Sequence, residues 1–336
     1  MKYDVKFYDK NYILDCVYNK DIDKLKIAIH IHLYYIDMLN IFIQYLSESP
    51  IYFDLFISVT SENNKDICIK EINKYKIKKI NNLDIKVVEN IGRDVAPWII
   101  EFPNIQSNYD LCCHLHTKKS LYNDELSGWG EYLIKNLISK EAINNIVSSF
   151  SLDNKLGIIF PPIYRNAFCH ILSLSDVDKN ALSILLKRIN IDFNPDYNNF
   201  IFPAGTMLWY RPKVLQPIFN MNLTYDDFPK EPIPTTGTIA HAIERLIGII
   251  CEKYNYKIKC YITRESLIEN FFDLYWIYED KKSIQTQLNI LKKNSIPNIK
   301  IFLSILEIGK FALLKILKYN KNLIIIILGV KITFKL

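Results

Sequence analysis

The sequence has 336 residues, 49% of them hydrophobic, which is enough to bury one large α/β core. Its formal net charge is +6, and the segment from Lys310 to Leu336 alone holds six lysines and no acidic residue. Because the excess positive charge lies in this tail, the rest of the chain lacks the basic stripe that nucleic-acid binding requires. We therefore expect no nucleic-acid partner.

The cysteines and the first residues indicate a cytoplasmic compartment. Seven cysteines are scattered without a CxxC pair, which is typical of reduced thiols. The opening residues MKYDVKFYDK do not form the apolar run of a secretory signal.

Short apolar segments alternate with helical segments from residue 25 onwards. Strands are predicted over residues 27–33, 52–59, 84–90, 109–115, 208–210 and 257–262, with helices over 37–46 and 68–80. Such a βαβ pattern predicts an α/β fold of the Rossmann-like kind, in which helices cover both faces of a mostly parallel sheet.

We expect three parts: a lead-in over residues 1–24, the α/β domain over 25–275, and a helical basic tail over 276–336. In the tail, lysines alternate with apolar residues at helical spacing, for example Lys315 and Lys318 among Phe311, Leu314 and Leu317. This spacing predicts a basic amphipathic helix on an anionic membrane surface; packing against the domain or a partner is the alternative. The apolar run Leu323–Val330 is too short to span a bilayer.

Three ends of the predicted strands carry unusual segments with polar residues. They lie at 89–94 (ENIGRD), 116–120 (HTKKS) and 203–207 (PAGTM). Ligands of α/β proteins bind outside the carboxyl ends of the strands, so these segments are the candidates for a site.

Four motifs, at residues 89–99, 109–120, 202–215 and 237–248, resemble in that order the rhamnan synthesis protein F family. The resemblance covers about residues 25–265 and implies a glycosyltransferase, commonly a rhamnosyltransferase, in assembly of cell-surface polysaccharide. More distantly, the motifs are similar to inverting transferases of the GT-A type. The resemblance implies a GT-A-like domain, a nucleotide-sugar donor with dTDP-rhamnose as the first to test, and a lipid-linked glycan acceptor at the inner face of the cytoplasmic membrane.

The second motif departs from those distant relatives, in which the strand ends in an Asp-x-Asp pair that holds a metal. Here it ends in His116, Thr117, Lys118, Lys119 and Ser120. Charge on a leaving diphosphate must be met by a metal, by Lys or Arg, or by helix amides, so we expect the two lysines to supply fixed positive charge. A solvated basic turn is the alternative. A divalent cation (Mg²⁺ or Mn²⁺) at Asp94 or Asp226 is the weaker option for this site.

The first motif supplies further donor contacts at Asn90, Gly92, Arg93 and Asp94. Arg93 suits a phosphate, and Asp94 suits a sugar or ribose hydroxyl. A structural role at the start of a helix is the alternative for both.

In the third motif, Gly205 and Thr206 would let the backbone approach the sugar or acceptor. Trp209 is a candidate for stacking on a sugar face, with burial in the core as the alternative.

The fourth motif holds the predicted catalytic base. Inverting transfer requires a group that removes the proton of the acceptor hydroxyl, and Glu244 has the spacing of the base in the distant relatives. His241 lies three residues earlier and shares a helix face with it. Arg245 is a candidate diphosphate contact or a structural ion pair.

Two histidines on the first strand, His30 and His32, share one face. Satisfied core histidines are the simpler interpretation. For the whole chain, the alternative to an enzyme is a non-catalytic carbohydrate-binding or scaffolding subunit of a polysaccharide assembly complex, which the missing Asp-x-Asp pair favours.

Overall fold

The computed structural model describes residues 12–13, 22, 24–119, 126–164, 167, 174–194, 200–230, 232–267 and 269, and the backbone of strands between 306 and 335. The chain forms two compact units, Met1–Lys281 and Lys282–Leu336. Each is described by itself.

The first unit is built on an 8-stranded sheet with the order β1-β8-β6-β7-β5-β2-β3-β4. Strand β7 runs antiparallel to both of its neighbours, whereas the other pairings described in this sheet are parallel. The predicted α/β fold with a mostly parallel sheet is thus confirmed. The strands are β1 Tyr12–Ile13, β2 Ile27–Leu33, β3 Phe53–Val59, β4 Ile80–Val87, β5 Leu111–His116, β6 Leu156–Phe160, β7 Leu208–Tyr210 and β8 Lys257–Tyr261.

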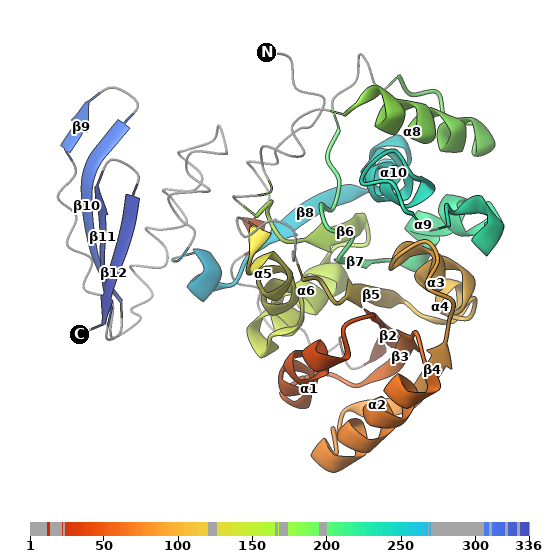
Figure 1. Ribbon diagram of the computed structural model, residues 1–336, viewed down its shortest axis with the longest axis horizontal. Helices are drawn as coiled ribbons and strands as arrows, with labels where there is room; N and C mark the ends of the chain where they lie inside the picture. The colour runs from red at the N-terminus through yellow and green to blue at the C-terminus, as the bar shows by residue number, and fades with distance from the viewer. Residues whose placement is uncertain are drawn as a thin grey trace. The chain divides into compact units, whose positions relative to one another are not determined.

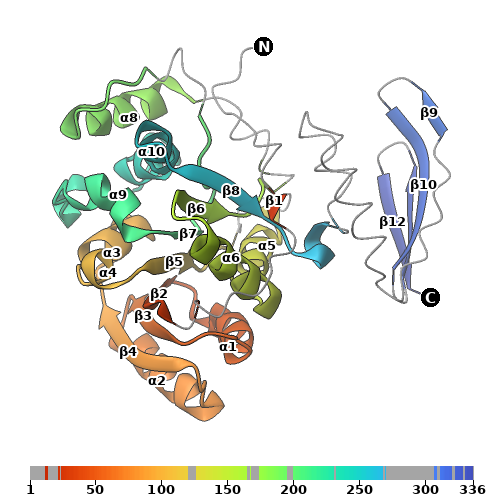
Figure 2. The same cartoon turned by 180° about the vertical axis from the view of Figure 1, so that it is seen from behind.

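Helices cover both faces of this sheet (Figures 1 and 2). One layer holds α1, α5 and α6, with α2 beside α1; the other holds α3, α4, α9 and α10, and α8 packs on α10. The bounds are α1 Leu39–Ser47, α2 Glu62–Tyr75, α3 Val95–Ile100, α4 Ile105–Asn108, α5 Trp129–Ile138, α6 Lys140–Leu152, α8 Asp176–Arg188, α9 Pro212–Phe219 and α10 Ile239–Lys253, with short 3₁₀ turns at Ile36–Met38 and Tyr225–Asp227.

The central strands are buried along their whole length. Every residue of β2, β5 and β6 is buried, as expected for parallel strands covered on both faces. The histidines of β2 and β5 lie in register, with His30 opposite His114 and His32 opposite His116. Two pairs of histidines therefore lie side by side in the middle of the sheet.

Helix α10 is fixed at its start and its middle. Thr238 caps it through a capping box in which His241 is the third helical residue. Gly248 lies against the backbone of the segment before β7, where a β-carbon would fall 1.5 Å from the carbonyl oxygen of Ile201. This close approach requires glycine and sets the height of α10 over the sheet.

The described strands of the second unit form a 4-stranded antiparallel sheet with the order β12-β11-β10-β9. They are β9 Leu306–Ile308, β10 Phe311–Tyr319, β11 Asn322–Ile327 and β12 Val330–Lys335. The prediction of a basic amphipathic helix is therefore wrong for the described strands of this tail. Its run of isoleucines over 324–327 and the Val, Ile and Thr of β12 are β-branched, which disfavours helix and favours strand.

Within the residues described, no helix combines the length and the apolar composition needed to cross a membrane.

Replacing Gly248 with alanine is expected to destabilise the first unit. The added methyl group must displace the backbone at Ile201, and overpacking of this kind costs about 1–3 kcal/mol or more. Urea unfolding measures the change, with the exposed Lys253→Ala on the same helix as control, expected to stay within about 0.5 kcal/mol of wild type. Equal stability of the two variants would show that α10 is not held by this contact.

Candidate functional site

Three of the predicted segments and α10 meet at the carboxyl ends of β4 and β5. The Nε2 atom of His116 lies 2.7 Å from the carbonyl oxygen of Gly205 and 3.8 Å from Oδ2 of Asp94. The backbone N–H of Gly205 donates to Oε1 of Glu244 over 2.6 Å. The chain of contacts from Asp94 through His116 and Gly205 to Glu244 brings all four sequence motifs to one place.

Asp94 precedes α3 and faces the histidines of β5. His114 donates from Nε2 to its Oδ2 over 3.3 Å. Burial alone would raise the pKa of Asp94, but His116 and the hydrogen bond from His114 outweigh it and hold the pKa well below its usual range. The carboxyl group is therefore ionised at neutral pH.

Glu244 is held from two sides. Besides the Gly205 N–H, it accepts a hydrogen bond from Nη1 of Arg245 over 2.7 Å. Arg245 is itself buried, donates to the carbonyl of His241 over 2.9 Å, and lies 4.0 Å from Asp178 of α8. These contacts fix the Glu244 carboxylate beside the turn that enters β7.

His241 connects α10 to the first motif. Burial has the largest effect and lowers the pKa of His241 to about 4. Glu244 raises this pKa and Arg93 lowers it further, so the ring is neutral at pH 7. Its Nε2 lies 3.2 Å from Nη1 of Arg93, and its Nδ1 lies 2.8 Å from Oγ1 of Thr238. The second Nη of Arg93 donates to the carbonyl of Pro234 over 3.1 Å.

Lys118 places its ammonium over the ring of Trp129, 4.0 Å from the ring centre. Burial, the largest effect, lowers the pKa of Lys118; Glu244 and Asp94 raise it, and Arg93 lowers it. The charges of both carboxylates therefore act on its ammonium group, yet Lys118 forms no salt bridge with any residue that the structure describes.

The neighbours of Lys118 are used differently. Lys119 forms an ion pair with Asp37. Oγ1 of Thr117 accepts hydrogen bonds from the backbone N–H groups of Tyr34 and Tyr35, each over 3.0 Å, and so joins β5 to the end of β2. Of the predicted lysine pair, the structure leaves Lys118 as the available cation.

Two pairs of residues at the site have left-handed backbone. Gly92 and Arg93 have φ of 71° and 57°, and Gly205 and Thr206 have φ of 93° and 57°. A non-glycine residue with positive φ costs free energy and is enriched at functional sites. At Gly205, a β-carbon would also fall 2.8 Å from Leu133, so this turn has no room for a side chain.

Trp209 does not reach the site. Its side chain is fully buried, and Nε1 donates to the carbonyl of Leu137 over 2.9 Å. The prediction that Trp209 stacks on a sugar is therefore wrong. Like its neighbours in β7, it lies in the core, because this strand is covered on both faces.

Among the other predicted residues, Asn90 and Asp226 are exposed, and Ser120 lies outside the described residues. In the portion of the chain with described side chains, no three His, Cys, Asp or Glu are grouped to hold a metal ion.

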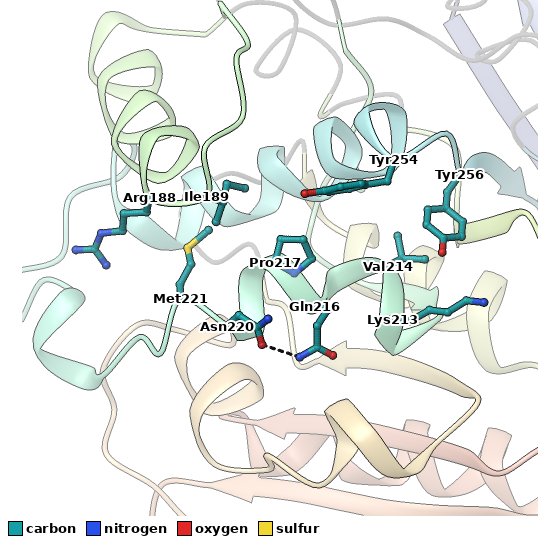
Figure 3. Close-up of a pocket in the computed structure, with 10 residues that line it drawn as sticks. All are labelled: Arg188, Ile189, Lys213, Val214, Gln216, Pro217, Asn220, Met221, Tyr254 and Tyr256. Carbon is teal, nitrogen blue, oxygen red and sulfur yellow. Dashed lines mark hydrogen bonds between the residues drawn. The ribbon is translucent and has the colours of Figure 1, made fainter.

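A pocket of about 560 Å³ lies at the opposite edge of the sheet, where β8 begins and α9 follows β7 (Figure 3). Tyr254 and Tyr256 form one side of it, and Gln216 and Asn220, joined by a hydrogen bond of 2.8 Å, lie on the other. None of the predicted site residues lines it.

The sequence analysis missed three residues that shape the site: Trp129, Asp178 and His114. Asp178 accepts hydrogen bonds from Thr236, Gly237 and Ser175, and so holds the segment before α10. A serine three residues before an aspartate marked this helix start in the sequence, but its distance from α10 along the chain hid the contact.

The fold and site define an α/β protein with a Rossmann-like sheet and a charged site at the strand ends. The family model for rhamnan synthesis protein F matches residues 2–256, and the chain belongs to this family. The description of this family names rhamnan synthesis.

Two relatives are uncharacterized proteins WxcX from Xanthomonas campestris pv. campestris, strains B100 and ATCC 33913. Each is 29% identical to this chain over 223 residues, which is 65% of this chain and 30% of the relative. The matched region thus spans less than a third of either relative.

The buried histidines predict a loss of stability in acid. Burial, the largest effect, lowers the pKa of His32 and of His114 from 6.5 to about 4, although Asp94 opposes the shift. Between these values the unfolded chain binds protons that the folded chain excludes. The free energy of unfolding therefore falls as the pH drops from 6.5 towards 4, by up to about 1.4 kcal/mol per pH unit for each histidine.

Urea unfolding at about pH 7, 5.5 and 4.5 measures this slope. His32→Gln, which removes one of the titrating groups, is expected to make the slope shallower. Stability that does not change over this range would contradict the assignment of neutral, buried rings.

Proposed function

We propose that the chain is a glycosyltransferase that moves a sugar from a nucleotide-sugar donor to a growing cell-surface polysaccharide. The observation that carries the proposal is that Lys118 and the carboxylates of Asp94 and Glu244 come together at the strand ends. Lys118 forms no salt bridge to the described residues. A cation to bind a diphosphate and a carboxylate to accept a proton are the two charged groups that such a transfer needs.

The donor diphosphate would bind Lys118. Its ammonium lies over the Trp129 ring, and its backbone carbonyl packs on Gly130, where a β-carbon would fall 2.5 Å from the carbonyl oxygen. Nε1 of Trp129 and Nε of Arg245 are buried without a hydrogen-bond partner in the described structure. Unpaired buried donors are rare, and phosphate oxygens would supply the acceptors.

Glu244 is the proposed base. It takes the proton of the acceptor hydroxyl while the hydroxyl oxygen bonds to the anomeric carbon of the donor sugar. The bond from that carbon to the diphosphate oxygen breaks, and the nucleoside diphosphate leaves with the bonding electrons. Each Glu244 oxygen accepts one hydrogen bond from the protein and keeps a second lone pair.

We propose dTDP-rhamnose as the donor and a lipid-linked glycan at the inner face of the cytoplasmic membrane as the acceptor. The family description, which names rhamnan synthesis, supports the choice of rhamnose.

A non-catalytic carbohydrate-binding subunit is the second candidate. The observation in its favour is that both oxygens of Glu244 already accept hydrogen bonds from Gly205 and Arg245, as a structural carboxylate would.

Glu244→Gln decides between the two. Glutamine keeps the acceptor for the Gly205 N–H but is no base, so transfer is expected to fall by at least about 100-fold while donor binding stays near wild type. The measurements are sugar transfer and calorimetric binding of dTDP-rhamnose, with the exposed Glu62→Gln as control. Transfer retained by the variant would remove Glu244 as base, and wild-type protein that binds glycan but transfers nothing would favour the second candidate.

Lys118→Met is expected to weaken donor binding by about 10-fold or more, because it removes a charge-assisted contact but keeps a stem over Trp129. Lys119→Met is the matched control and should change the affinity little, since that lysine pairs with Asp37. Titration of dTDP-rhamnose with and without EDTA separates a lysine site from a metal site. Equal losses in both variants, or binding that disappears in EDTA, would count against Lys118.

A further inference from the structure

A line of buried polar side chains runs from β3 across β2 and β5 to Asp94. Nδ1 of His32 lies 2.9 Å from Oγ of Ser58, which lies 3.2 Å from Nε2 of His30. Nδ1 of His30 lies 2.9 Å from Nδ1 of His114, whose Nε2 is 3.3 Å from Oδ2 of Asp94. The first three contacts join β2 to β3 or β5, and the last one, from His114 to Asp94, reaches the site.

The carboxylate fixes the direction of every hydrogen bond in this line. Ionised Asp94 can only accept, so His114 donates from Nε2, and its Nδ1 must accept from Nδ1–H of His30. Nε2 of His30 then accepts the hydroxyl hydrogen of Ser58, and Oγ of Ser58 accepts from His32. Each imidazole carries one proton, which agrees with the lowered pKa of all three rings.

Packing holds the rings in this orientation. The rings of His30 and His114 are nearly parallel, with planes 8° and centres 5.1 Å apart, and Trp98 stacks on His114 at 4.3 Å and 7°. Ser58 and His114 are 0% exposed, and His30 is 1% exposed. Water therefore cannot replace a broken link at low cost.

Asp94 is the accessible end of the line. Its side chain is 12% exposed, and both histidine contacts are on Oδ2. Within the described part of the chain, Oδ1 accepts no hydrogen bond. The charge of Asp94 also acts on Lys118 and raises its pKa.

We propose that His32, Ser58, His30 and His114 form a one-way hydrogen-bond chain that positions Asp94, so that its Oδ1 accepts a hydrogen bond from a sugar hydroxyl of the bound donor. This role rests on the proposed function, and it makes the four buried groups positioning residues that touch no substrate. It also accounts for polar residues in the middle of an apolar sheet, where each unpaired one would destabilise the fold.

The first experiment measures the chain without any ligand. Long-range ¹H–¹⁵N spectra of protein labelled in histidine report which ring nitrogen carries the proton. We expect Nε2–H for His114 and Nδ1–H for His30 and His32 near pH 7, and a shift of the His114 signals in Ser58→Ala. A proton on Nδ1 of His114, or His114 signals unmoved by Ser58→Ala, would overturn the chain.

The second experiment measures its effect on the donor. Ser58→Ala removes the central link and is expected to raise the Kd for dTDP-rhamnose by about 3- to 10-fold, with kcat changed less than KM. Ser148→Ala is the matched control, since Ser148 is equally buried and its hydroxyl has no hydrogen-bond partner among the described residues. An affinity in Ser58→Ala equal to that in Ser148→Ala would overturn the positioning role.

The two experiments keep the two proposals apart. Wild-type protein that binds no nucleotide sugar would remove the proposed donor, and with it the sugar contact of Asp94. The histidine spectra would still show whether the chain exists. Normal donor binding with the wrong tautomers would remove the chain and leave the proposed transferase standing.

Discussion

The bond from the Gly205 N–H to Glu244 is the contact on which the site depends. It ties α10 to the turn that enters β7, and the same turn offers its carbonyl to His116 on β5. Because Gly248 lets α10 lie against the backbone at Ile201, this helix cannot shift along the sheet without breaking the bond. Gly205 and Gly248 thus fix the distance between α10, which carries Glu244, and β5, which carries His116.

The charge arrangement follows from that geometry. The carboxyl groups of Asp94 and Glu244 are both largely buried, and different groups stabilise them. Arg245 is in direct contact with Glu244, Asp94 accepts a hydrogen bond from His114, and the charges of both acids act on Lys118.

Much of the fold was predictable from sequence because parallel strands are short, apolar and separated by helices, and the segments expected for β2, β3 and β5 are close to those observed. The structure of the tail was not predictable in this way. Its lysines spaced three apart suit a helix, whereas the isoleucines beside them suit a strand. Pairing between the strands favours the sheet. Within the site, Asp94 and Lys118 were predicted from strand ends, and Glu244 from the spacing of the base in the distant relatives. The tie of Asp178 to the segment before α10 and the link of His30 to Asp94 depend on contacts between distant segments, which no local pattern contains.

The reversed direction of β7 has a consequence for how the site is built. In a wholly parallel sheet, each strand contributes to the ligand edge the residues that follow it. Because β7 runs the other way between β5 and β6, it contributes the residues that precede it, with the Gly205–Thr206 turn arriving at the edge before the strand begins. The strand then carries the chain away from the site to the opposite edge, where α9 starts. Changes in the segment that enters β7 would thus alter the ligand edge while leaving the later strand and helix in place, so specificity can vary there independently of the core.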